Sequence, residues 1–198
     1  MFRWWLFCLA WLALACSAHA ESLTPLHGVD LPALTTAQPL VGMAVIDGQT
    51  VAVAAGQAWR LDDARKRWLA LAWPATVPNE VALIQDGTRA YLLWTAQGHT
   101  AVAELHPRGD RLDAAALPAL PARLIDARGA VSADALFVAG KDADGKACAW
   151  QANPADPRTG WTEVPAWPGS EPALSLATQG PNLFVAVGRE SGQHLLRW

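Results

Sequence analysis

The chain has 198 residues, of which 52% are hydrophobic and 17% charged, and its formal net charge at pH 7 is −3. This length is enough for one domain with a sizeable core. The mild charge, with no basic run longer than Arg65–Arg67, argues against nucleic acid and anionic membrane surfaces as partners.

The first twenty residues have the pattern of a secretory signal peptide. Arg3 precedes an apolar run from Trp4 to Ala15, and Ala18-His19-Ala20 is a small-residue cleavage site. We therefore expect residues 1–20 to be removed, and residues 21–198 to form a mature domain that is periplasmic or secreted. The apolar run is shorter than the roughly 20 residues that a membrane span needs. No later run approaches that length, so we expect no span in the mature chain.

A unit of short strands recurs along the mature chain. Its equivalent strands start at Val51, Tyr91, Leu136 and Leu183, which are 40, 45 and 47 residues apart. Turn residues precede these strands, and the sequence lacks the 3.6-residue period of helical repeats. A repeat of this length built from short strands predicts the blades of a β-propeller. We expect about four blades of four antiparallel strands from about Val41 onward.

The predicted outer strand of each unit is closed by a proline. These strands are Trp68 to Pro74, Leu112 to Pro118 and Trp161 to Pro168. A similar segment, Leu26 to Pro32, comes before the first unit, whereas the last unit stops at His194 to Trp198 without an outer strand. We expect these two segments to pair and so remove an open sheet edge. Two interpretations stay open: four blades close on themselves, or the chain is the front of a truncated six-bladed ring, which we favour.

These motifs resemble Kelch-type propeller blades, best in Asn153 to Pro165 with its Asp-Pro-x-Thr-Gly-Trp turn. The segment from Leu31 to Ala72 also resembles the start of bacterial N-acetylneuraminate epimerases, the sialic acid mutarotases. The resemblance implies an all-β, Kelch-type β-propeller and a sugar as ligand. It departs from the family in two ways, because the usual Gly-Gly pair is reduced to one glycine and the connections are short. No catalytic residue can therefore be carried over, and the catalytic residues stay unknown.

The sequence offers little chemistry of its own. The five histidines have no metal-ligand spacing and fit no Ser-His-Asp arrangement, so we expect no metal and no cofactor. Cys148 lies in an apolar strand pattern that predicts a buried, inert thiol. Lys141 and Arg189 follow predicted strands and are the predicted ligand contacts. The tryptophans that could stack on a sugar, if exposed, are Trp73, Trp94 and Trp167.

Three functions from different classes remain open. The first is an exported, noncatalytic propeller that binds a carbohydrate, such as sialic acid or a related sugar, or another extracytoplasmic protein. The second is a sugar mutarotase or epimerase, which needs a positioned acid and base. The third is the extracytoplasmic propeller at the N-terminus of a sodium/solute symporter. We favour the first, because the export signal is clear and no catalytic set can be assembled from the sequence.

Overall fold

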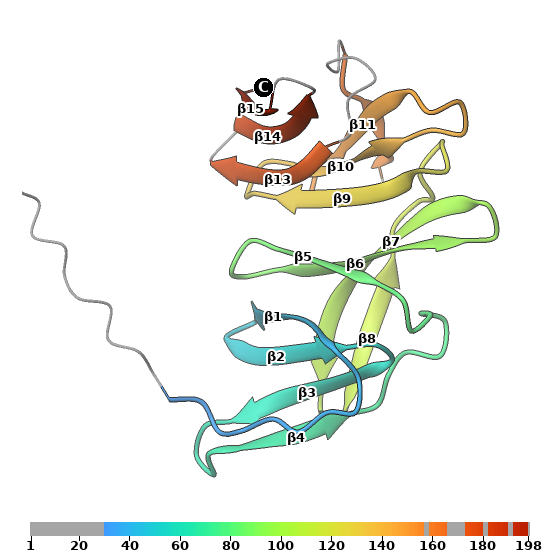
Figure 1. The fold of residues 1–198 in the computed structure, drawn as a ribbon. Coiled ribbons are helices and arrows are strands. Elements are labelled where there is room, and N and C mark those ends of the chain that lie inside the picture. The colour runs from blue at the N-terminus through green and yellow to red at the C-terminus, as the bar shows by residue number, and fades with distance from the viewer. Residues whose placement is uncertain (1–29, 157–158, 166–172, 180–181, 190–191, 198) are drawn as a thin grey trace, which may run out of the picture. The chain divides into compact units, whose positions relative to one another are not determined.

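The computed structural model describes residues 30–156, 159–165, 173–179, 182–189 and 192–197. Within these ranges the chain is all-β, and its strands form four antiparallel sheets in succession (Figure 1). All four sheets belong to one compact unit, Pro32–Trp198. No helix among the described residues is long and apolar enough to cross a membrane.

Each sheet is a meander in which strands neighbouring in sequence are neighbours in space. The first sheet contains β1 (Leu40–Ile46), β2 (Gln49–Ala54), β3 (Gln57–Asp62) and β4 (Arg67–Leu71). The second contains β5 (Ala82–Gln85), β6 (Ala90–Ala96), β7 (His99–Arg108) and β8 (Arg111–Ala116). The third contains β9 (Ile125–Val131), β10 (Leu136–Lys141), β11 (Ala147–Ala152) and β12 (Thr162–Glu163). The fourth contains β13 (Ala173–Gln179), β14 (Asn182–Arg189) and β15 (Gly192–Arg197).

Two-residue turns set the register of several hairpins. Asp47 and Gly48 join β1 to β2 with φ values of 50° and 73°, and Gln97 and Gly98 join β6 to β7 with 43° and 85°. Turns with two positive φ values match the twist of paired strands, and glycine tolerates them without a steric cost. The result is a fixed pairing of Ile46 with Gln49 in the first hairpin.

Apolar side chains fill the space between consecutive sheets in three layers. Val51 and Val53 of β2 pack with Leu92 of β6 between the first and second sheets. Tyr91 and Val138 belong to the layer between the second and third sheets. The third layer contains Phe137, Ala139, Ala149, Leu183, Val185 and Val187. Burying one large apolar side chain contributes about 1.5–3 kcal/mol, so these layers supply the main stabilisation of the unit.

The innermost strands of neighbouring sheets approach each other closely. A Cβ atom added at Gly129 of β9 would collide with the side chain of Ile84 of β5. At Gly42 of β1 it would lie 3.0 Å from Cδ2 of Leu83. Strands β5, β9 and β13 also lie side by side in Figure 1. Glycine at position 129 therefore allows this close packing, whereas at position 42 an added Cβ would require only the flexible end of Leu83 to move.

The prediction of an all-β chain with four-stranded antiparallel sheets in succession is confirmed, and the sheets follow one another like propeller blades. The Kelch type is not assigned by this topology. The predicted second strands are also confirmed, as β2, β6, β10 and β14. The fourth sheet has three strands among the described residues.

The predicted outer strands are too long. Strand β4 ends at Leu71 rather than Pro74, and β8 ends at Ala116 rather than Pro118. Proline has no N–H to donate to a ladder, so the pairing ends before it. In the third sheet β12 comprises only Thr162 and Glu163, and Pro168 lies outside the described residues. The predicted pairing of Leu26–Pro32 with the last sheet stays a prediction, because residues up to 29 also lie outside them.

Candidate functional site

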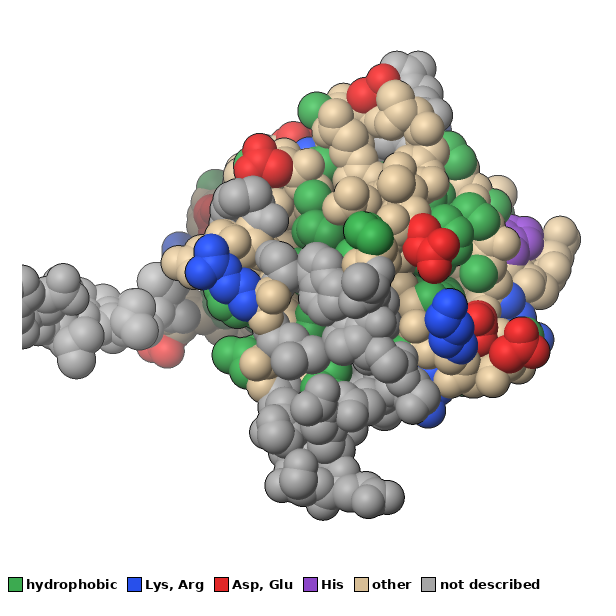
Figure 2. Space-filling model, turned by 90° about the horizontal axis from the view of Figure 1, so that it is seen from above, with side chains coloured by type: hydrophobic (Ala, Val, Ile, Leu, Met, Phe, Trp, Pro, Cys, Tyr) green, Lys and Arg blue, Asp and Glu red, His purple; other side chains and the backbone are tan. Residues whose placement is uncertain are grey.

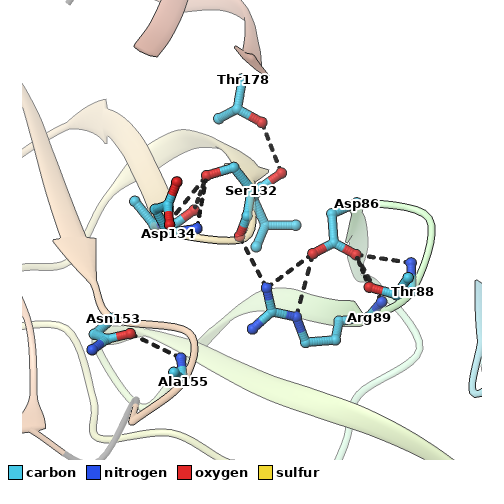
Figure 3. Close-up of polar contacts among 10 residues, drawn as sticks. Asp86, Thr88, Arg89, Ser132, Asp134, Asn153, Ala155 and Thr178 are labelled. Carbon is cyan, nitrogen blue, oxygen red and sulfur yellow. Dashed lines mark hydrogen bonds and ion pairs between the residues drawn. The ribbon is translucent and has the colours of Figure 1, made fainter. Parts of the chain in front are cut away.

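A cavity of about 770 Å³ lies where three innermost strands end. One wall is Leu83–Thr88, from β5 and the turn after it, and a second is Gly129–Ala133, from β9 and its turn. The third wall is Leu176–Thr178 of β13. Three consecutive sheets thus bring together residues that are far apart in the sequence, and Figure 3 shows their polar contacts.

Backbone edges form much of this cavity, because β5, β9 and β13 are each the edge strand of their sheet. The N–H of Ser132 donates to the carbonyl of Ala135 across the β9–β10 hairpin at 2.8 Å. Inward and outward hydrogen bonding alternates along an antiparallel strand. The N–H and C=O groups of Gly129 and Val131 therefore point away from β10. In agreement, the Val131 carbonyl accepts a hydrogen bond of 2.7 Å from the Thr178 hydroxyl of the next sheet.

The turn after β5 is organised around the carboxylate of Asp86. This carboxylate accepts hydrogen bonds from the N–H and the hydroxyl of Thr88, both at 2.9 Å. It also accepts one from the N–H of Arg89 at 2.8 Å and two from the Arg89 guanidinium at 3.1 and 3.3 Å. Aspartate favours such turns because its short side chain reaches backbone N–H groups two or three residues later. The turn is therefore closed by its own side chains.

Hydrogen bonding keeps Asp86 ionised. Burial alone would raise the pKa of this carboxyl, but the hydrogen bonds from Arg89 and Thr88 outweigh burial and hold the pKa below its ordinary value. The Arg89 guanidinium also donates to the carbonyl of Ser132 at 3.0 Å (Figure 3). Arg89 thereby ties the second sheet to the third beside the cavity.

Burial raises the pKa values of two ionisable groups between the second and third sheets, Tyr91 and Cys148. The pKa of the Tyr91 hydroxyl is raised to about 12 by burial and by the negative charge of Glu104. Burial also raises the pKa of the Cys148 thiol, and this side chain is 6% exposed. The prediction of a buried Cys148 is confirmed, and the raised pKa agrees with the prediction of an inert thiol.

Lys141, one of the two predicted ligand contacts, is not among the described residues that line this cavity. Lys141 is the last residue of β10, at the opposite end of that strand from Ser132, and it pairs with Ala147. Arg189 ends β14, paired with Gly192. That Lys141 and Arg189 contact a ligand stays a prediction.

The tryptophans considered for sugar stacking do not form one face. Trp73 is half-buried against the first core layer, and its indole N–H donates to the carbonyl of Val77 at 3.0 Å. Trp94 is half-buried and lines a separate cavity of about 470 Å³ with Glu80. Trp167 lies outside the described residues. The described residues that line the cavity at the strand ends are aliphatic, small and polar, and none of them is a tryptophan.

Charged groups are dispersed over the surface that the structure describes. On the face drawn in Figure 2, acidic and basic side chains stand near one another in small groups. Asp113 pairs with Arg111 at 3.0 Å and with Arg108 at 3.6 Å. In the described part of the chain, no group of three or more His, Cys, Asp or Glu side chains is placed to hold a metal ion.

Comparison with known proteins gives a distant structural likeness. No protein-family model matches the sequence. No curated protein sequence matches it either. Among solved structures, the chain is similar to the WD40 domain of SCAP from fission yeast, with a TM-score of 0.42 and 14% sequence identity. The match covers 79% of this chain, which spans about 39% of the length of that structure.

Proposed function

We propose that the chain is exported through residues 1–20 to the periplasm or the medium, and there acts as a noncatalytic carbohydrate-binding domain. Its ligand occupies the cavity at the ends of β5, β9 and β13. The observation that carries this proposal is the cavity itself, whose volume of about 770 Å³ suits a small molecule. Backbone and hydroxyl groups from three sheets line it, and sugar hydroxyls both donate and accept hydrogen bonds.

The state of the ionisable groups favours binding over catalysis. A general acid or base works best when its pKa lies near the working pH. Asp86 has a lowered pKa and is fully engaged in its turn, whereas the pKa values of Tyr91 and Cys148 are raised. A sugar mutarotase would need an acid and a base close to the sugar ring, and these groups suit neither role.

The test is calorimetric titration of the exported chain with neutral monosaccharides and disaccharides. We expect saturable binding that weakens several-fold in Thr178→Val, which removes the hydroxyl that joins β13 to β9. Thr50→Val is the matched control, because Thr50 lies on β2 and does not line the cavity. No binding of any sugar, or equal weakening by both substitutions, would contradict the proposal.

A further inference from the structure

We infer that this cavity selects neutral, hydroxyl-rich sugars and rejects acidic ones. This inference rests on the proposed function and names the class of its ligand. It differs from the expectation drawn from the sequence, in which Lys141 and Arg189 would receive an acidic sugar.

The first reason is the charge of the lining. Among the described residues that line the cavity, Asp86 is the charged one, and the others are apolar, amide, hydroxyl or glycine residues. The cation of the same turn, Arg89, is committed to two partners at once. Its guanidinium donates to Asp86 at 3.1 Å and to the carbonyl of Ser132 at 3.0 Å. A ligand carboxylate would therefore meet a negative side chain without gaining a cation of its own.

The second reason is the direction of the hydroxyl hydrogen bonds. The Thr88 hydroxyl donates to Asp86 at 2.9 Å, and the Thr178 hydroxyl donates to the Val131 carbonyl at 2.7 Å. A hydroxyl has one proton to donate and two lone pairs to accept with. Because both protons are already used, these oxygens face a ligand as acceptors. They favour a ligand that brings its own O–H donors, which a carboxylate lacks.

The third reason is the backbone edge. The free N–H groups of Gly129 and Val131 offer donors that are not charged, and they complement the hydroxyl oxygens of the ligand. A backbone N–H can also donate to a carboxylate, but it carries no net charge and so supplies no cation to balance a second carboxylate beside Asp86. A ring with several hydroxyls, in contrast, has both the donors and the acceptors that the cavity walls require.

A pair of ligands that differ only in charge tests the inference. N-acetylneuraminate and its methyl ester have the same ring and hydroxyls, but the ester has no negative charge. We expect the exported chain to bind the ester at least tenfold more tightly than the acid. Equal or tighter binding of the acid overturns the inference and leaves the proposed function intact. If the ester, the acid and the neutral sugars all fail to bind, the proposed function is also wrong.

A substitution that adds a cation gives the converse test. Ala133 is exposed and lines the cavity in the β9–β10 turn. Ala133→Lys should tighten binding of the acid about tenfold and leave binding of the ester within twofold. Ala143→Lys is the matched control, because Ala143 is equally exposed in the β10–β11 turn but does not line the cavity. The inference fails if Ala133→Lys leaves the affinity for the acid unchanged while the unfolding midpoint stays that of the parent chain.

Discussion

The indole N–H of Trp161 donates a hydrogen bond to the carbonyl of Pro118 at 2.7 Å. In the first sheet, Trp68 makes the corresponding bond to Pro32 at 2.8 Å. In both cases the tryptophan lies at the outer strand of a sheet, and the proline lies in the segment that leads into the innermost strand of the same sheet. In these two sheets, the bond therefore holds the segment that leads into the innermost strand against the outer strand.

We predict that Trp161→Phe lowers the free energy of unfolding by about 1 kcal/mol, because phenylalanine keeps an aromatic ring but lacks the N–H. Chemical denaturation followed by circular dichroism measures this loss. Trp68→Phe should give a loss of similar size, since its hydrogen bond to Pro32 has a similar length, 2.8 Å. Unchanged stability in both variants would show that the two hydrogen bonds do not contribute.

We predict that Gly129→Ala destabilises the chain by roughly 1–3 kcal/mol, because the new Cβ would overlap the side chain of Ile84. Shortening the opposing side chain in Gly129→Ala/Ile84→Val should recover part of the loss, which a double-mutant cycle measures. Gly42→Ala is the milder comparison, since its Cβ would meet the flexible end of Leu83 at 3.0 Å. Strictly additive losses at positions 129 and 84 would contradict the close approach of β5 and β9.

The Asp86 turn predicts a dependence of stability on pH. The folded-state pKa of Asp86 lies below the ordinary value of an aspartate, so the folded chain binds fewer protons here than the unfolded chain. The contribution of this carboxylate is complete above about pH 5 and is lost as the pH falls through the folded pKa.

Asp86→Asn should therefore lower the free energy of unfolding by about 1–3 kcal/mol at pH 7, since it removes the charged acceptor of the turn. The difference from the parent chain should shrink between about pH 5 and pH 2, because the parent loses its charge there too. Denaturation curves at a series of pH values measure this convergence. A difference that stays constant down to pH 2 would refute the role of the carboxylate.

We predict that the chain does not accelerate the interconversion of sugar anomers. Asp86 lines the cavity and has a lowered pKa, and the pKa of the buried Tyr91 is raised to about 12, so neither group suits general acid or base catalysis at neutral pH. Nuclear magnetic resonance exchange between the anomers of N-acetylneuraminate, with and without protein, measures the rate. An acceleration that disappears on heat denaturation would make the mutarotase hypothesis the leading one.

Much of the fold follows from local signals in the sequence. Asp47-Gly48 and the apolar run after it predict a hairpin, and the recurrence of such runs predicts successive sheets. The sequence does not predict where the outer strands end, because Pro74 and Pro118 mark the end of a segment and not its last paired residue.

The cavity could not be located from the sequence. Arg89, in the turn after β5, contacts Ser132, which is 43 positions later in the chain, and local turn signals do not predict such a contact. The free edges of β5, β9 and β13 become a shared wall only after the core layers have set the spacing of the sheets. The sequence indicates Lys141 and Arg189 as ligand contacts because they are cations near strand ends. The cavity lies at the opposite end of β10 and β14.

Amide hydrogen exchange with and without a neutral sugar tests the central claim most directly, because it reports where the ligand binds. The account predicts that added sugar slows exchange at the backbone amides of Leu83, Gln85, Gly129 and Val131, which lie on the free strand edges of the cavity. Protection confined to the Lys141 end of the sheets, or no protection at saturating sugar, would contradict it.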